Sequence, residues 1–370
     1  FVVIMMNMMV RTTSLLSRNK LFHSPRKTFS KGNQNQNTVF RFSSKSADAQ
    51  DDEEDNEEDI VASGFKETRS SYPPNSHSLQ NNHLKHRLRT GFPLTGVVSG
   101  QYRDTDHVEM LGLLGYDFLW ADAEHSSASP DDIATMILAA ERRGLPTLVR
   151  IGYGYQHIIG HVQKYLVSGA QGILLPQCES RDDVERIINA VKFPPLGQRG
   201  LAGERWNAWG LATASGSGSC DDPASPNKYV PLSQCVEAAN QNSIVGVLIE
   251  NQKGLDALDE IMTVPELDLI FLAPTDLSAN MGLPGQIRHP KVVAKIEQAG
   301  QKIQRFNEEH QSGSDRGTIA VGTLVLTAED YAYWRERNFQ VLCGVAQCMF
   351  VDGAKNLLDK IQEYEQRNIK

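Results

Sequence analysis

Eight short apolar runs alternate with helical patterns along the chain, and this alternation limits the folds that it can adopt. The runs are continuously apolar, which is typical of strands buried on both faces of a parallel sheet. Eight β/α units in sequence predict an α/β fold, a single-domain TIM (β/α)8 barrel. A doubly wound open sheet is the alternative architecture. The runs cover residues 95–98, 118–121, 147–150, 172–176, 245–250, 269–273, 319–324 and 339–343.

Helical patterns fill the intervals between the runs. Ser129-Pro130-Asp131-Asp132 is a helix start, with Ser as the N-cap, Pro at the first helical position and acids in the first turn. Further helices are expected after Ser180 and at residues 133–140, 157–167, 255–262, 291–306, 331–337 and 354–364.

One connection, between residues 191 and 243, is much longer than the others and contains a Gly/Ser-rich insertion at about 211–230. Long loops in compact domains are usually functional lids or flexible insertions. Arg205 and Trp206 in this connection are therefore candidates to cover a site.

The N-terminal segment differs in composition from the rest of the chain. Residues 1–47 are rich in Arg, Lys and Ser, and no acid occurs between Met5 and Ser46. This composition predicts an organelle transit peptide and import into the mitochondrial matrix, with a plastid or cytoplasmic location as the alternatives. Residues 48–91 carry a block of like charge from Asp51 to Asp59 and are expected to form an acidic, disordered linker. The barrel domain is expected to span residues 92–370.

Charge and cysteine usage exclude several classes of function. The net charge is -8 and no basic face stands out, so we expect no nucleic-acid partner. The apolar patch at residues 1–6 is too short to cross a bilayer, and we expect no membrane partner. The 5 cysteines form no CxxC pair and are interpreted as reduced thiols.

Ionisable residues follow four of the apolar runs at their carboxyl ends, where a TIM barrel carries its active site. They are Asp122, Glu124 and His125 after the second run, Arg150 at the end of the third, Glu250 at the end of the fifth and Asp276 after the sixth. Any one of them has a structural explanation, as a helix cap or a salt-bridge partner. Their coincidence at one rim predicts a functional site.

The types of these residues indicate their chemistry. Neighbouring strand ends place Glu250 beside Asp276, and two such carboxylates repel each other unless a cation lies between them. Two protein oxygens with waters and substrate oxygens suit Mg²⁺ or Mn²⁺, with Co²⁺ or Zn²⁺ as possible substitutes. His125 is a candidate general base that Asp122 orients. Arg150 offers a planar fork for a carboxylate or an enolate oxygen.

These segments resemble the HpcH/HpaI class II aldolase family, which includes 4-hydroxy-2-oxoheptanedioate aldolases and 2-keto-3-deoxy-acid aldolases. The resemblance covers about residues 92–365. The matching segments, in chain order, are residues 115–118, 122–125, 146–150, 169–176, 193–200, 249–250 and 274–282.

The resemblance implies a metal-dependent carbon–carbon lyase that cleaves 4-hydroxy-2-oxo acids to pyruvate and an aldehyde through a metal-bound pyruvate enolate. Glu250 and Asp276 match the metal ligands of the family. Arg150 matches the arginine that binds pyruvate, and His125 with Asp122 matches the base.

Other positions have roles that the resemblance implies less directly. Backbone amides around Pro274 and Thr275 are implied to receive the pyruvate carboxylate. Glu124 belongs to the same motif as the base, where it either holds the loop or contacts a metal-bound water. The family commonly forms hexamers with a swapped last helix, which implies a homo-oligomer with residues 354–364 as the swapped segment.

The chain departs from the family pattern near the site. Leu248 stands where many members have Gln, Ala273 replaces a Gly, and residues 151–155 replace a different loop. A citrate-lyase-β-like or malyl-CoA-lyase-like enzyme is one alternative, but it needs a basic groove for coenzyme A phosphates that the sequence does not offer. A non-catalytic barrel used for binding is the other.

Overall fold

A computed structural model describes residues 83–152, 158–211, 229–310 and 317–368 of the chain. Its eight parallel strands are hydrogen-bonded in sequence order and close into a barrel, because β8 pairs with β1. The TIM barrel is therefore confirmed and the open sheet is excluded. The strands are β1 (Leu94–Ser99), β2 (Phe118–Asp122), β3 (Thr147–Arg150), β4 (Gly172–Leu175), β5 (Ile244–Ile249), β6 (Leu269–Leu272), β7 (Ala320–Leu324) and β8 (Val341–Val345).

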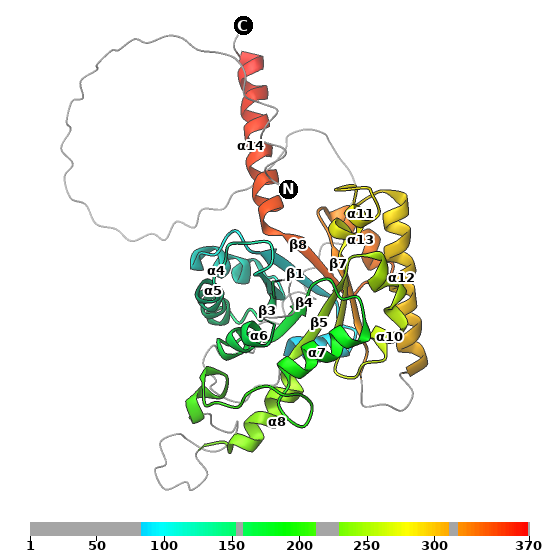
Figure 1. Cartoon of the computed structure of the whole chain (residues 1–370). Helices are drawn as coiled ribbons and strands as arrows, with labels where there is room; N and C mark the ends of the chain where they lie inside the picture. The colour runs from blue at the N-terminus through cyan, green and yellow to red at the C-terminus, as the bar shows by residue number, and fades with distance from the viewer. Residues whose placement is uncertain (1–82, 153–157, 212–228, 311–316, 369–370) are drawn as a thin grey trace, which may run out of the picture. The chain divides into compact units, whose positions relative to one another are not determined.

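Helices alternate with the strands and surround the barrel (Figure 1). The predicted start at Ser129 is a capping box, in which the Ser129 hydroxyl accepts from the amide of Asp132 and the Asp132 carboxylate accepts from that of Ser129. The helices are α3 (His83–Arg89), α4 (Thr105–Leu114), α5 (Pro130–Arg142), α6 (Ile158–Val167), α7 (Arg181–Val191), η3 (Arg205–Gly210), α8 (Leu232–Asn242), α9 (Gln252–Asp256), α10 (Leu258–Met262), α11 (Pro274–Asn280), α12 (Pro290–His310), α13 (Ala328–Arg335) and α14 (Ala346–Asn368).

The barrel has an outer and an inner apolar core, and successive strand residues contribute to them in turn. On β2, Leu119 faces the surrounding helices, whereas Phe118 and Trp120 face the barrel axis. Large inward side chains are accommodated by glycines on neighbouring strands. A Cβ atom on Gly96 would collide with the ring of Phe118, and one on Gly322 would lie 2.7 Å from a ring carbon of Phe271. The interior is therefore a packed core rather than a channel.

Helix α3 closes the amino-terminal end of the barrel. Its side chains Leu84 and Leu88 are buried and belong to the inner core. The folded part of the chain therefore begins before residue 92, where the sequence analysis placed the domain boundary. Part of the predicted linker is a helix because the open end of the barrel buries its two leucines.

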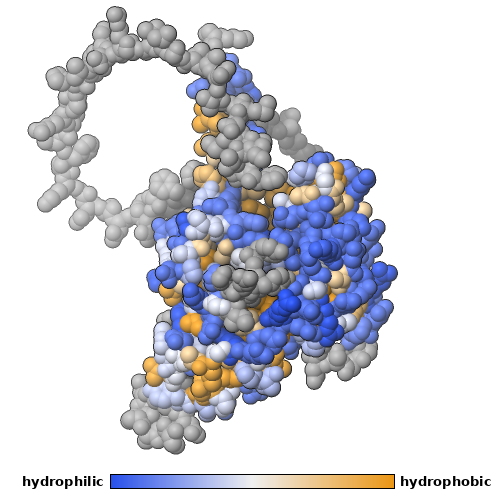
Figure 2. Space-filling model, in the orientation of Figure 1, coloured by the Kyte–Doolittle hydropathy of each residue, from blue (hydrophilic) through white to orange (hydrophobic). Residues whose placement is uncertain are grey.

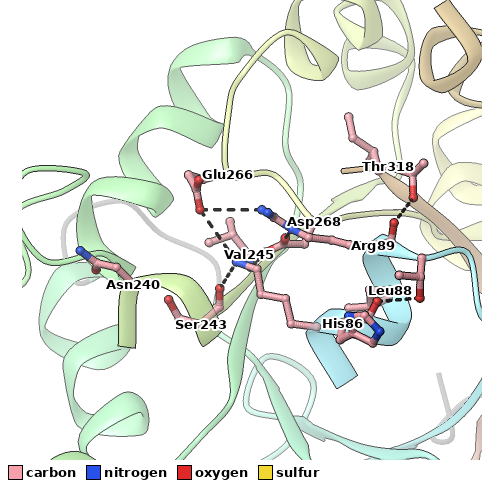
Figure 3. A network of polar contacts seen from close by, with 12 residues as sticks. His86, Leu88, Arg89, Asn240, Ser243, Val245, Glu266, Asp268 and Thr318 are labelled. Carbon is pink, nitrogen blue, oxygen red and sulfur yellow. Dashed lines mark hydrogen bonds and ion pairs between the residues drawn. The ribbon is translucent and has the colours of Figure 1, made fainter. Parts of the chain in front are cut away.

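A buried ionic network fixes α3 to the strands (Figure 3). Nζ of Lys85 donates to the carbonyl of Ser243 at 2.8 Å and lies 3.3 Å from the carboxylate of Asp268, which also accepts from Nε of Arg89 at 2.9 Å. Lys192 lies 3.0 Å from Glu266 in the same network. Burial lowers the pKa of Lys85 to about 8, although the charge of Asp268 opposes this shift.

The part of the long connection around Arg205 lies at the same amino-terminal end of the barrel. Arg205 pairs with Glu141 near the end of α5 and donates to the carbonyl of Ser168 directly after α6. Both helices end where the chain enters its next strand, so these contacts are on the face opposite the strand carboxyl ends. The prediction that Arg205 and Trp206 cover the site is therefore wrong.

Among the residues that the structure describes, the last helix, α14, has no packing partner for most of its length. The helix extends away from the barrel (Figure 1), its residues from Met349 to Asn368 are exposed, and apolar residues are among them (Figure 2). These apolar residues are Met349, Phe350, Val351, Leu357, Leu358, Ile361 and Tyr364. Among the helices that the structure describes, none is long and apolar enough to cross a bilayer.

Three of the predictions lie wholly or mostly outside the described residues. They are the transit peptide at 1–47, the acidic linker up to residue 82, and residues 212–228 of the Gly/Ser-rich insertion. The family departure after Arg150 lies outside them at residues 153–157.

Candidate active site

The strand carboxyl ends bring the predicted ionisable residues to one rim of the barrel. Asp122 is the last residue of β2 and pairs in register with Arg150, the last residue of β3. Glu250 directly follows β5, and Asp276 lies in the first turn of α11, which begins two residues after β6. The closed barrel therefore collects side chains that are up to 154 positions apart in the sequence, from Asp122 to Asp276.

A buried two-point ion pair joins Asp122 and Arg150. Nε of Arg150 donates to Oδ1 of Asp122 at 2.8 Å, and an Nη atom donates to Oδ2 at 2.6 Å. Burial alone would raise the pKa of Asp122, but the hydrogen bonds and charge of Arg150 outweigh it and lower that pKa. The same pairing, opposed by burial, raises the pKa of Arg150. Both groups are therefore held in their charged forms, in one geometry.

Asp122 also fixes the loop that follows β2. Its Oδ1 atom accepts from the backbone amides of Glu124 at 3.0 Å and of His125 at 3.4 Å. The sequence analysis expected Asp122 to orient the imidazole of His125. The structure shows a different arrangement, because the carboxylate is committed to Arg150 and to these two amides.

The neighbour of the His125 imidazole is Glu124. Its Oε2 atom lies 3.7 Å from Nε2 of His125 and 3.2 Å from an Nη atom of Arg150. The imidazole is 56% exposed, whereas the carboxylate of Glu124 is 6% exposed. Burial raises the pKa of Glu124, the charges of Arg150 and His125 oppose that shift, and those of Asp122 and Asp276 add to it. Glu124 therefore links the buried ion pair to the solvent-facing imidazole.

Glu250 is a buried carboxylate, and only one of its two oxygens accepts a hydrogen bond from a described residue. Its Oε1 atom accepts from the backbone amide of Gln177 at 2.6 Å, and its Oε2 atom has no hydrogen-bond partner among the described residues. Burial, reinforced by the charge of Asp276, raises the pKa of Glu250 to about 8. A buried, unpaired carboxylate oxygen beside a second acid is costly unless a cation binds there.

These acids fit a divalent metal held by few protein ligands. The described residues contain no group of three or more His, Cys, Asp or Glu side chains arranged to hold an ion. Glu250 and Asp276 would therefore supply two oxygens, and water and substrate the remainder. Mg²⁺ and Mn²⁺ accept oxygen ligands of this kind in octahedral geometry.

Two residues at this rim escaped the sequence analysis. Gln177 has a positive φ of 49° and orients Glu250 through its backbone amide, so its side-chain type carries no signal. Trp120 faces inward two residues before Asp122, with its ring centroid 5.5 Å from the guanidinium carbon of Arg150. The alternation of inward and outward residues along β2 was the available signal for Trp120.

Comparison with known proteins identifies the family of the chain. The sequence pattern of the HpcH/HpaI aldolase/citrate lyase family matches residues 102–339, which include every ionisable residue described above. The chain belongs to this family.

Relatives in the HpcH/HpaI family carry aldolase names. A hydroxypyruvate/pyruvate aldolase of Roseovarius nubinhibens is 31% identical over 279 residues, covering 75% of this chain and 96% of that protein. A 2-keto-3-deoxy-L-rhamnonate aldolase of Escherichia coli is 28% identical over 248 residues, covering 66% of this chain and 81% of that protein. A solved HpcH/HpaI aldolase/citrate lyase family protein from Burkholderia cenocepacia has a TM-score of 0.61 and 26% identity, covering 76% of this chain and 100% of that one.

The ion pair between Asp122 and Arg150 predicts a pH-dependent loss of stability when Asp122 is replaced. The folded-state pKa of Asp122 is lowered, so the pair stabilises the fold above pH about 4 and this contribution is lost as the pH falls through the folded-state pKa. Asp122→Asn leaves Arg150 buried without its partner, which should lower the free energy of unfolding at pH 7 by about 3–5 kcal/mol.

Urea unfolding of wild type and variant between pH 7 and pH 3 measures this difference. The gap between the two proteins should narrow below pH about 4, because Asp122 protonates in the unfolded wild type there and in the folded protein as the pH falls through its lowered pKa. Asp131→Asn, at an exposed acid on the adjoining helix, is the matched control and should change stability by no more than about 0.5 kcal/mol. A gap that stays constant with pH would contradict the assignment.

Proposed function

We propose that this protein is a divalent-metal-dependent aldolase that cleaves 4-hydroxy-2-oxo acids to pyruvate and an aldehyde. The observation that carries the proposal is the unpaired, buried carboxylate oxygen of Glu250, which lies in the field of Asp276 on the rim that holds the Arg150–Asp122 pair. Membership of a family of aldolases and citrate lyases supports the same reaction class. Mg²⁺ or Mn²⁺ is the proposed metal.

Glu250 and Asp276 would hold the metal, which would supply a Lewis acid to draw electron density from the 2-oxo group. Arg150 places a fixed positive charge at the same rim, where it can bind a carboxylate or stabilise a developing enolate oxygen. Since Asp122 already holds the guanidinium in place, little reorganisation is needed as charge develops on the substrate. The first turn of α11 has no side-chain cap, so the amides after Pro274, beginning with Thr275, can donate hydrogen bonds to the substrate carboxylate.

The bond cleavage needs a base that reaches the 4-hydroxyl group. The imidazole of His125 is exposed at the rim, beside the carboxylate of Glu124, and is the proposed proton acceptor. Loss of that proton lets the C4–O bond become a carbonyl as the C3–C4 bond breaks, and the aldehyde leaves. The electron pair of the broken bond forms the enolate of pyruvate, which becomes pyruvate on protonation at C3.

The printed names of the relatives suggest a choice of substrates. A hydroxypyruvate/pyruvate aldolase and a 2-keto-3-deoxy-L-rhamnonate aldolase share a 2-oxo acid at the reacting end and differ in the rest of the molecule. We propose that the 2-oxo acid end is recognised in the same way here. A panel of 4-hydroxy-2-oxo acids that differ only beyond C4 is therefore the appropriate assay set.

Replacing a metal-binding carboxylate should abolish metal-dependent release of pyruvate. Glu250→Gln and Asp276→Asn each remove one charged ligand, and we expect activity to fall at least about 100-fold, because each group is proposed to act on the reacting atoms. Pyruvate release is followed with Mg²⁺ or Mn²⁺ and with chelator, on the panel described above.

The control is Glu260→Gln, an exposed acid on α10, which should keep wild-type activity. Chelator should abolish the wild-type reaction and added metal should restore it. Turnover that survives the chelator, or that survives in both site variants, would contradict the proposal.

We also propose that α14 packs against a second copy of the chain. Its exposed apolar residues recur at three- and four-residue spacing, and they include Leu357, Leu358 and Ile361. In a closed (β/α)8 barrel the last helix would lie next to α4, and α4 presents exposed Met110, Leu113 and Leu114. An apolar helix and an apolar face that no described residue covers suit an exchange of helices between identical chains.

Disrupting this helix should dissociate the assembly. Leu358→Glu with Ile361→Glu places two charges on the apolar stripe, whereas Lys360→Glu on the polar side is the control. Light scattering after size exclusion should give a multiple of the chain mass for wild type and control, and a smaller species for the double variant. A monomeric wild type would contradict the proposal.

A further inference from the structure

Trp120 carries a buried hydrogen-bond donor that nothing in the described structure satisfies. Trp120 is only 2% exposed, and its indole Nε1 atom has no hydrogen-bond partner among the described residues. An unpaired buried N–H costs about 1–3 kcal/mol. In native proteins such a group usually pairs with a water or a ligand.

The indole lies directly below the proposed active site. Trp120 and Asp122 are two residues apart on β2, so both side chains face the barrel axis. The guanidinium carbon of Arg150 is 5.5 Å from the centroid of the indole, and the ring of Phe271 meets the indole edge-on at 4.8 Å between centroids. The Arg150 guanidinium, which is paired with Asp122, therefore packs against the indole.

The surroundings of this N–H favour an acceptor that comes from the active-site side. The inner core around Trp120 consists of apolar side chains with Cys343, and α3 closes the other end of the barrel with Leu84 and Leu88. Arg150 is a cation and cannot accept a hydrogen bond. The carboxylate of Asp122 already receives two donors from Arg150 and two backbone amides.

We propose that Trp120 is a substrate-binding residue, whose indole N–H donates a hydrogen bond to an oxygen of the bound 2-oxo acid. This inference rests on the proposed aldolase function and adds a donor to the same site. The carboxylate and keto oxygens of a 2-oxo acid are acceptors, and a charged acceptor strengthens such a bond in a poorly solvated interior.

The direct test follows the indole N–H by NMR in the full chain labelled with ¹⁵N-tryptophan. The chain has 4 tryptophans, so at most four indole signals are expected. Pyruvate is added in the presence of Mg²⁺. The proposal predicts a downfield shift of the Trp120 indole proton on binding, which a purely structural role for the ring would not produce.

The paired variant is Trp120→Phe, which keeps an aromatic ring and removes the N–H. Its affinity for pyruvate should fall about tenfold, the loss expected for one hydrogen bond to a charged acceptor. Trp334→Phe is the control, because Trp334 is a buried tryptophan in the outer core on α13, and it should bind pyruvate as wild type does. If Trp120→Phe does not fold, replacing the other three tryptophans in turn assigns the wild-type signal.

The outcomes separate this inference from the proposed function. Pyruvate could bind without shifting the Trp120 signal, or bind Trp120→Phe and wild type with equal affinity. Either result would show that the indole N–H does not donate to the substrate. It would overturn this inference and leave the proposed aldolase function standing. Absence of pyruvate binding to the wild type, together with absence of pyruvate release, contradicts the aldolase function and this inference with it.

Discussion

The two hydrogen bonds between Arg150 and Asp122 are the interaction on which the rest of the site depends. They join the ends of two adjacent strands inside the barrel, where neither charge can rely on water for stabilisation. The same carboxylate holds the loop that carries Glu124 and His125. Removing it would leave the guanidinium without its two-point partner and would release the loop. The position of the proposed base therefore depends on a carboxylate that does not contact its imidazole in the structure.

The two ends of the barrel differ in how their polar groups are paired. The carboxyl ends of the strands carry unpaired or strained polar groups, such as the free oxygen of Glu250 and the positive φ of Gln177. The opposite end is closed by α3 and by the network of Lys85 with Asp268, in which charges are paired. The long connection through Arg205 belongs to this second end. The contacts of Arg205 are therefore remote from the rim that carries Glu250 and Arg150.

Local sequence predicted the fold well because its main signals are local. Eight continuous apolar runs are strands whatever their partners, and residues directly after such runs reach the carboxyl rim of a parallel barrel. Glu250 and Asp276 could therefore be chosen from position and charge alone. Helix α3 was missed because a short segment with two leucines is stable only when a barrel end buries it. The pairing of Asp122 with Arg150 was missed because it depends on the register of β2 against β3. That register brings together two residues 28 positions apart, whereas His125 is only three positions from Asp122.

Binding of Mn²⁺ tests the central claim most directly, because it examines the site without requiring the natural substrate. Electron paramagnetic resonance of Mn²⁺ titrated into the full chain measures how much of the ion remains free. The account predicts that the wild type binds a single Mn²⁺ per chain, that Glu250→Gln loses this binding, and that Mg²⁺ competes for it. Equal binding by the wild type and Glu250→Gln, or none by the wild type, would contradict the account.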